Sequence, residues 1–175
     1  LGKTMKYQSA GEKENKNSSN DFKKALSTAL RYLTYRYRSR QEILEHLNKK
    51  QFDKETIEKT LSYLSQLDYV NDQKFALNWG KSLAKNKRVG KHRLLRELTH
   101  KGISDSAAKH ATRKIFSEFN EWELAKTCAE KKVSSLEKHD IYAKRRKLAG
   151  YLERKGFPTS MILKALNLFA PLNRS

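Results

Sequence analysis

The stretch GKHRLLRELTHKGI, residues 90–103, decides the fold of this chain, because its pattern occurs three times. Its apolar residues recur at the three- and four-residue spacing of an amphipathic helix, and a Lys-Gly turn follows. The corresponding apolar positions are Ile43, Leu44, Leu47 and Phe52 in the first copy, Leu94, Leu95, Leu98 and Ile103 in the second, and Leu148, Ala149, Leu152 and Phe157 in the third. Copies roughly fifty residues apart indicate a repeat protein.

Each copy ends in a turn between two predicted helices. The turns read NKKQFD, THKGIS and ERKGFP, and Gly102 and Gly156 occupy the place where a helix C-terminus favours a left-handed residue. Gln51 stands at this place in the first copy. Pro158 is expected at the start of the last helix, and Pro171 is expected just after its end. These breaks separate the second helix of each copy from the third.

Two capping signals mark helix starts in the first copy. Ser39 is expected to cap a helix in which Glu42 reaches back, as in a capping box. Asp53 is expected to cap the helix that follows. A looser apolar pattern predicts one further helix before each copy, over residues 25–33, 75–84 and 122–133. Each repeat is therefore expected to contain three helices.

The predicted fold class is all-α, because no convincing strand pattern occurs. Three tandem three-helix repeats are predicted, over residues 22–72, 73–119 and 120–171. Residues 1–21, which are polar with almost no apolar residue, predict a disordered tail, and residues 172–175 form a short tail. Each repeat is too small to be very stable alone and is expected to depend on its neighbours.

The segment RYLTYRYRSR, residues 31–40, places three tyrosines among four arginines. Aromatic rings can stack on bases while guanidinium groups hold phosphates, so this segment is a candidate nucleic-acid platform. The helical stripe that includes Leu33 predicts that Tyr37 is buried. Tyr35 lies on another face with Arg31 and Arg38, where surface packing and a binding role are equally expected.

The chain of 175 residues carries a formal net charge of +19 and has a pI near 10.0. This charge predicts attraction to a polyanion, with a nucleic acid as the first candidate and an anionic membrane surface as the rival. Residues 73–119 alone carry +9. No apolar run approaches the roughly 20 residues needed to cross a bilayer, and no signal-peptide pattern appears, so a cytoplasmic protein is expected. The single cysteine, Cys128, is expected to be buried.

No catalytic constellation is evident in the sequence. The histidines are scattered, at His46, His92, His100, His110 and His139, and no cysteine or carboxylate lies near them at a zinc-ligand spacing. The seven glycines are dispersed, so no phosphate-cradling loop is formed. The chain is therefore not expected to be an enzyme or to hold a metal or cofactor.

Basic residues gather at the junction between the first and second predicted helix of each repeat. In the second repeat, near Gly90, backbone amides at the helix start would help the side chains to hold phosphate. The predicted binding residues are Lys81, Lys85, Lys87, Arg88, Lys91, Arg93 and Arg96 in the second repeat and Lys144, Arg145, Arg146 and Lys147 in the third. A secondary set in the first repeat is Arg31, Tyr35, Arg36, Arg38 and Arg40. Recurrence at one place in three copies favours a binding surface over an ordinary solvated face.

Four segments together resemble the RecX family, bacterial regulators of the RecA recombinase, in their Gram-positive type. YVNDQKFA, residues 69–76, resembles the junction between RecX repeats, and residues 90–103 resemble the second repeat. SRQEILEHLNKKQF, residues 39–52, and YLERKGF, residues 151–157, match the first and third repeats. The resemblance covers about residues 22–169. Gram-positive members can carry an additional folded N-terminal region, which residues 1–21 do not match.

The resemblance implies an elongated, curved, all-helical and monomeric protein without a cofactor. Such a protein binds RecA filaments on single-stranded DNA and mainly inhibits RecA ATPase, strand exchange and co-protease activity, in homologous recombination, DNA repair and the SOS response. The implied partners are thus the RecA nucleoprotein filament and single-stranded DNA, with duplex DNA as a further option. The basic junctions are compatible with contacts to DNA in such a filament.

Two other functions fit the residues. Three-helix units with a tight second turn also describe helix-turn-helix modules, so a transcription regulator that binds duplex DNA is the main alternative. Such a protein would prefer one duplex sequence by roughly 10³ or more in affinity. The other alternative is a helical scaffold that binds an acidic protein, which would bind its partner tightly without DNA.

Overall fold

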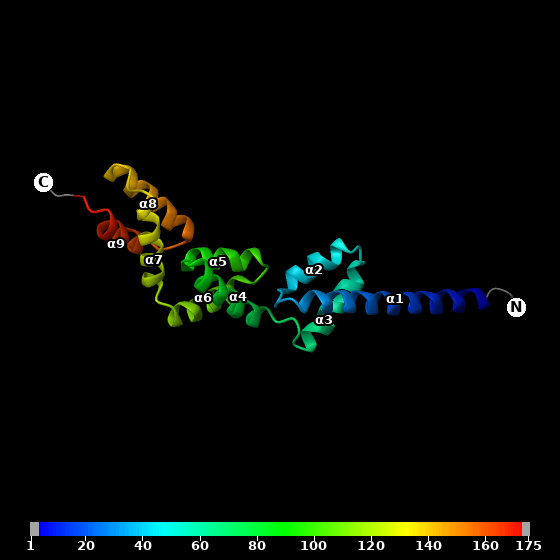
Figure 1. The fold of residues 1–175 in the computed structure, drawn as a ribbon. Helices are drawn as coiled ribbons and strands as arrows, with labels where there is room; N and C mark the ends of the chain where they lie inside the picture. The colour runs from blue at the N-terminus through cyan, green and yellow to red at the C-terminus, as the bar shows by residue number, and fades with distance from the viewer. Residues whose placement is uncertain (1–3, 173–175) are drawn as a thin grey trace. The chain divides into compact units, whose positions relative to one another are not determined.

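The computed structural model describes residues 4–172, which form helices joined by short turns, with no strand in that range (Figure 1). The helices are α1 (Thr4–Leu33), α2 (Arg40–Lys49), α3 (Lys54–Gln66), α4 (Asp72–Lys87), α5 (Lys91–His100), α6 (Asp105–Glu118), α7 (Glu121–Ser134), α8 (Ile141–Lys155) and α9 (Thr159–Phe169). The all-α prediction is confirmed, and the helices follow one another in groups of three.

The chain forms two compact units, Leu1–Asp72 and Gln73–Ser175. In the first unit, α2 and α3 pack against the C-terminal half of α1 (Figure 1). Its core consists of Ala25, Ala29, Ile43, Leu47, Ile57, Leu61, Leu64 and Val70. The small alanines of α1 allow the other two helices to approach closely, which buries the leucines and isoleucines that the repeat pattern places on their inner faces.

The second unit contains two cores, one for each group of three helices. The core of α4–α6 includes Phe75, Leu94, Leu98, Ile103 and Ile115. The core of α7–α9 includes Ala125, Leu148, Leu152, Phe157 and Ala165. The apolar positions that the repeat pattern aligns on the second helices are therefore the centres of these cores, since Leu94, Leu98, Leu148 and Leu152 are fully buried.

Helix α1 begins at Thr4, whereas the sequence predicts a disordered tail over residues 1–21. Residues 1–3 of that segment, and residues 173–175 of the predicted C-terminal tail, lie outside the described range. Helix formation requires a costly nucleus, but extending an existing helix does not, and the segment contains no proline to stop the extension.

The prediction that Tyr37 is buried is wrong. Helix α1 ends at Leu33, and the Tyr37 side chain is 63% exposed. The reason lies in the next helix: the predicted capping box is present, with Glu42 N donating to Ser39 Oγ at 3.2 Å and Ser39 N donating to Glu42 Oε2 at 3.3 Å. Because α2 starts there, residues 34–39 form the connection and the helical stripe cannot continue to Tyr37.

The turn after the second helix of each group has a left-handed residue at the same place, with φ of 63° at Gln51, 78° at Gly102 and 86° at Gly156. The prediction for the two glycines is confirmed, and Gln51 adopts the same conformation without being glycine. The predicted helix starts at Asp53 and Pro158 are also confirmed, because Asp53 caps α3 and Pro158 occupies the N-cap of α9.

Candidate nucleic-acid interface

The basic residues predicted in the second repeat lie along α4, the turn after it, and α5. They are Lys81, Lys85, Lys87, Arg88, Lys91, Arg93 and Arg96. Two of them are paired with carboxylates, since Lys81 Nζ lies 2.6 Å from Glu118 Oε2 and Arg93 Nε lies 3.2 Å from Glu97 Oε1. The exposed side chains without an ion-pair partner among the described residues are those of Lys85, Lys87, Lys91 and Arg96.

The start of α5 packs against the turn between α8 and α9. Gly90 N donates to Lys155 O at 2.8 Å, and His92 N donates to Gly156 O at 3.1 Å. A Cβ atom at Gly90 would lie 2.4 Å from Gly156 O, so a residue larger than glycine could not approach this closely. The basic junction of the second repeat is therefore partly a contact surface inside the second unit.

The amide of Lys91, at the start of α5, is bound as well. Lys91 N donates to Glu121 Oε1 at 2.8 Å, and Glu121 is the first residue of α7. The carboxylate neutralises the positive end of the helix, and the amides have acceptors inside the unit. The amides of Gly90, Lys91 and His92 therefore already have acceptors inside the unit, and the side chains around them remain the candidates for holding phosphate.

Arg88 lies in the turn between α4 and α5 with a left-handed φ of 48°. Its carbonyl oxygen accepts a hydrogen bond from Cys128 Sγ at 3.5 Å. Cys128 is 3% exposed, which confirms its predicted burial, and this burial raises the pKa of the thiol. Because the thiol stays protonated at neutral pH, Cys128 serves packing in this turn and is a poor nucleophile.

The basic residues predicted in the third repeat lie on α8: Lys144 and Arg145 are half-buried, and Arg146 and Lys147 are exposed. Arg145 has a structural role, because its Nη1 donates to Leu166 O at 3.2 Å and to Ala170 O at 2.6 Å. The Ala170 carbonyl lies just beyond the C-terminal end of α9, where helix acceptors lack backbone donors, whereas Leu166 O also accepts from Ala170 N at 3.0 Å. Lys147 Nζ contacts His139 Nε2. Arg145 is thus a poor candidate for a ligand contact.

The secondary set in the first repeat is largely engaged inside its own unit. Arg36 pairs with Glu42 at 2.8 Å, Arg40 pairs with Glu58 at 2.5 Å, and the Arg38 guanidinium lies 3.9 Å from the centre of the Tyr32 ring. Arg31 is exposed, and the Tyr35 side chain is 81% exposed. Of this set, Arg31 and Tyr35 are exposed and their side chains have no hydrogen-bond or ion-pair partner among the described residues.

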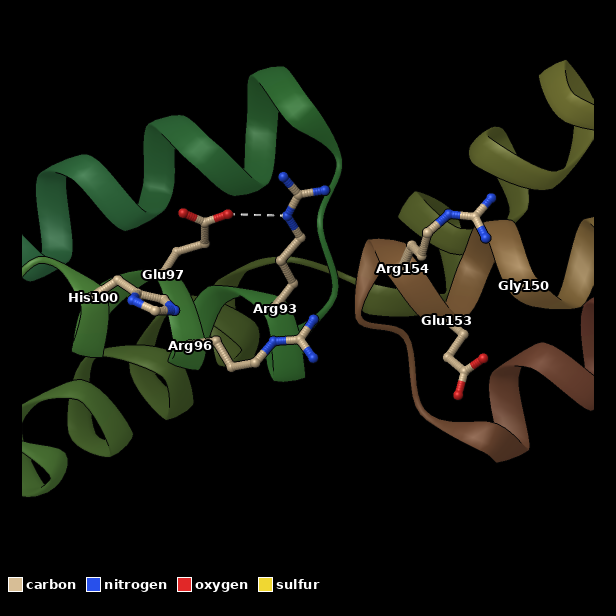
Figure 2. Close-up of a pocket in the computed structure, with 7 residues that line it drawn as sticks. All are labelled: Arg93, Arg96, Glu97, His100, Gly150, Glu153 and Arg154. Carbon is tan, nitrogen blue, oxygen red and sulfur yellow. Dashed lines mark hydrogen bonds and ion pairs between the residues drawn. The ribbon is translucent and has the colours of Figure 1, made fainter.

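A groove of about 580 Å³ lies between α5 and α8 in the second unit (Figure 2). Helix α5 lines it with Arg93, Arg96, Glu97 and His100, and α8 lines it with Gly150, Glu153 and Arg154. Figure 2 shows the Arg96 side chain extending into the space between the helices, and the Arg93–Glu97 pair beside it. The sequence prediction includes Arg93 and Arg96 but omits His100 and Arg154. The spacing 93, 96, 97 and 100 does mark one helix face, but it cannot show which helix lies opposite.

Within residues 4–172, no group of three or more His, Cys, Asp or Glu side chains could hold a metal ion. Over the same range, no helix combines the length and the apolar character needed to cross a membrane.

Comparison with protein families matches two parts of the chain to three-helix domains. Residues 25–64 match the first three-helix domain of RecX, and residues 120–166 match the third. These segments correspond to the core-forming parts of α1–α3 and of α7–α9. The chain thus shares with RecX the same type of domain at both ends of its repeat array.

Several curated relatives carry the name "Regulatory protein RecX". The relative from Amycolatopsis mediterranei is 34% identical over 140 residues, which cover 80% of this chain and 79% of the relative. The relative from Prosthecochloris aestuarii is 37% identical over 153 residues, which cover 86% of this chain and 96% of the relative. The relative from Bacillus cereus is 32% identical over 142 residues, which span 81% of this chain but 52% of the relative.

A solved structure is also similar. The crystal structure of RecX from Lactobacillus salivarius matches with a TM-score of 0.75 and 25% sequence identity, covering 88% of this chain and 99% of that chain. The all-helical architecture is therefore shared with an experimentally determined protein.

Proposed function

The chain belongs to the RecX family of regulatory proteins, and from this premise we propose that it regulates RecA by binding the RecA filament on single-stranded DNA. In this proposal the main effect is inhibition of ATP hydrolysis, strand exchange and co-protease activity in DNA repair and the SOS response. The chain acts as a monomer through binding, without catalysis and without a cofactor. The RecA filament is named as the partner on the basis of the family, and the basic surface of the second unit is the part of the chain that we propose contacts it.

The observation that carries the proposal is the set of exposed cations in the second repeat. Lys85, Lys87, Lys91 and Arg96 have no ion-pair partner among the described residues, on a chain whose net charge is +19. A cation without a carboxylate partner gains the full electrostatic attraction of an incoming phosphate, because no existing pair must be broken. These side chains are therefore the ones we assign to the filament, in place of the whole predicted set.

The proposal is tested by ATP hydrolysis of RecA filaments on single-stranded DNA, titrated with the chain, while binding to bare DNA is measured in parallel. We expect inhibition at protein concentrations too low to coat the bare DNA. The variant K85Q/K87Q/K91Q should require roughly tenfold more protein for the same inhibition, because each lost phosphate contact weakens binding. The control of equal charge is K109Q/R113Q/K114Q on α6, in which Arg113 and Lys114 have no ion-pair partner among the described residues and Lys109 pairs with Asp105 at 2.7 Å.

Absence of inhibition by the unmodified chain at saturating protein would refute the regulatory proposal. If the α4–α5 variant inhibited as strongly as the α6 control, the regulation would stand but its contact surface would have to lie elsewhere.

A further inference from the structure

We infer that the groove between α5 and α8 binds consecutive phosphates of single-stranded nucleic acid, without reading the bases. The inference rests on the proposed function, because it names the surface that would touch the DNA of the filament. It differs from the sequence prediction in its residues: Arg96 is joined by His100 of the same helix and by Arg154 of α8. The site is thus formed by two helix groups and is absent from either group alone.

The first step of the argument is the charge inside the groove. Three arginines and a histidine line it, against two glutamates. Glu97 is already paired with Arg93, at 3.2 Å, so its charge is largely compensated. In Figure 2, Glu153 and Arg154 point to opposite sides of α8. Arg96 and Arg154 are exposed and have no ion-pair partner among the described residues. The groove therefore offers two guanidinium groups to an incoming anion.

The second step is the rigidity of the groove. Its two walls are joined at one end by the backbone bonds from Gly90 N to Lys155 O and from His92 N to Gly156 O. Lys155 Nζ adds a bond of 2.6 Å to Lys87 O. Because these bonds fix α5 against the C-terminal end of α8, the arginines on the two walls are held apart before a ligand arrives. Such preorganisation lowers the entropic cost of binding.

The third step concerns the space that α8 leaves. A Cβ atom at Gly150 would lie 3.3 Å from Arg154 Nη1, so the absence of a side chain lets this guanidinium lie along the helix surface. Arg154 is therefore positioned along the wall of the groove. A guanidinium group placed in this way can bind a phosphate through two parallel hydrogen bonds.

The lining also identifies the kind of anion. Every lining residue is charged, a histidine or a glycine, and no aliphatic residue, Phe, Tyr or Trp contributes. An acidic protein segment normally depends on apolar or aromatic anchors that fill pockets, and this groove has none. The lining also contains no Phe, Tyr or Trp ring on which a base could stack. A sugar–phosphate backbone requires only the positive charges, so it is the ligand that the lining fits.

The test measures binding of the full chain to fluorescein-labelled single-stranded oligonucleotides by fluorescence anisotropy, over a range of salt concentrations. The groove variant is R96Q/R154Q, and the control R113Q/K114Q removes the same charge from α6. We expect the groove variant to bind roughly tenfold more weakly, while the control changes little. The slope of log K against log salt should fall in magnitude by about 1.4, from two lost phosphate contacts on a single strand. Oligo(dT) and a mixed sequence should behave alike.

Circular dichroism should give the same helix content for both variants, because the side chains changed in the groove are exposed. Equal weakening by groove and control variants would overturn the inference. So would an unmodified chain that binds a polyglutamate peptide but no single-stranded DNA, which would favour an acidic protein as the ligand. Bare-DNA binding needs no RecA, so persistent inhibition of RecA ATP hydrolysis alongside either result would leave the proposed function intact.

Discussion

Arg145 donates two hydrogen bonds to the carbonyl oxygens of Leu166 and Ala170, at the C-terminal end of α9. Its neighbour Arg146 is exposed and belongs to the same basic run. The two residues have the same chemistry and adjacent positions but different tasks, because only one of them points at another helix. At the scale of the residue, charge alone does not identify a side chain that binds a ligand. The partner of each guanidinium group shows whether that group is already engaged inside the protein.

We predict that R145M destabilises the protein by about 1–3 kcal/mol, because it removes both charged bonds at the end of α9 and leaves the Ala170 carbonyl without a donor. Methionine keeps much of the aliphatic stem, so the loss reports mainly the hydrogen bonds. The measurement is urea denaturation followed by circular dichroism. R146M is the matched control and should change the free energy of unfolding by less than about 0.5 kcal/mol. Equal effects of the two variants would contradict the capping role of Arg145.

At the scale of the element, the same hydrogen bond from a backbone amide to a carboxylate occurs at the start of the second helix in two groups. Arg40 N donates to Asp72 Oδ1 at 2.8 Å, and Lys91 N donates to Glu121 Oε1 at 2.8 Å. Each acceptor is the first residue of a later helix, α4 or α7. A carboxylate there satisfies an orphan amide and the positive end of the helix together. The acidic residue of the segment VNDQKFA is Asp72, so its bond to Arg40 N gives a physical reason for an acidic residue at this place.

The turn between α8 and α9 is a second element on which packing depends. Gly156 has φ of 86°, and a Cβ atom there would lie 2.3 Å from Arg93 N. We predict that G156A destabilises the protein by about 2–5 kcal/mol, from left-handed backbone strain and from the clash with α5. Gly102, with φ of 78°, provides the control. G102A should cost only the backbone strain, about 1–2 kcal/mol, in the same urea titration. A G156A loss no larger than that of G102A would show that α5 and the turn separate at little cost.

At the scale of the whole molecule, the second unit contains two cores that are connected by backbone hydrogen bonds. The only two tryptophans of the chain report on them separately, since Trp79 lies on α4 and Trp122 on α7. Trp79 packs against the core of α4–α6, and Trp122 packs against that of α7–α9. The two groups are connected by main-chain hydrogen bonds and by the close approach of Gly90 to Gly156. We therefore expect α4–α6 and α7–α9 to unfold as one cooperative unit.

We predict that R145M lowers the urea midpoint reported by Trp79 as much as the midpoint reported by Trp122. The first is measured by fluorescence in a W122F background and the second in a W79F background. Arg145 itself lies in the α7–α9 group, so a shift seen by Trp79 can arise only through coupling between the groups. A Trp79 midpoint that does not move would mean that the groups unfold independently.

Much of the fold follows from patterns a few residues long. The capping box at Ser39, the left-handed turn at Gly156 and the buried face of Leu94 and Leu98 all involve partners within about four positions, so neighbouring residues suffice to predict them. Tyr37 shows the limit of such patterns, because a helical stripe does not say where its helix ends.

Contacts between distant helices required the tertiary structure. Arg145 finds its acceptors 21 and 25 residues away, and Lys91 finds Glu121 30 residues away. The groove that Arg96 of α5 and Arg154 of α8 both line arises in the same way. Periodicity indicates which face of a helix is buried, but not which other helix covers it. The pairing of faces, and with it the division of the basic residues into structural and exposed ones, is set by how the cores pack against each other.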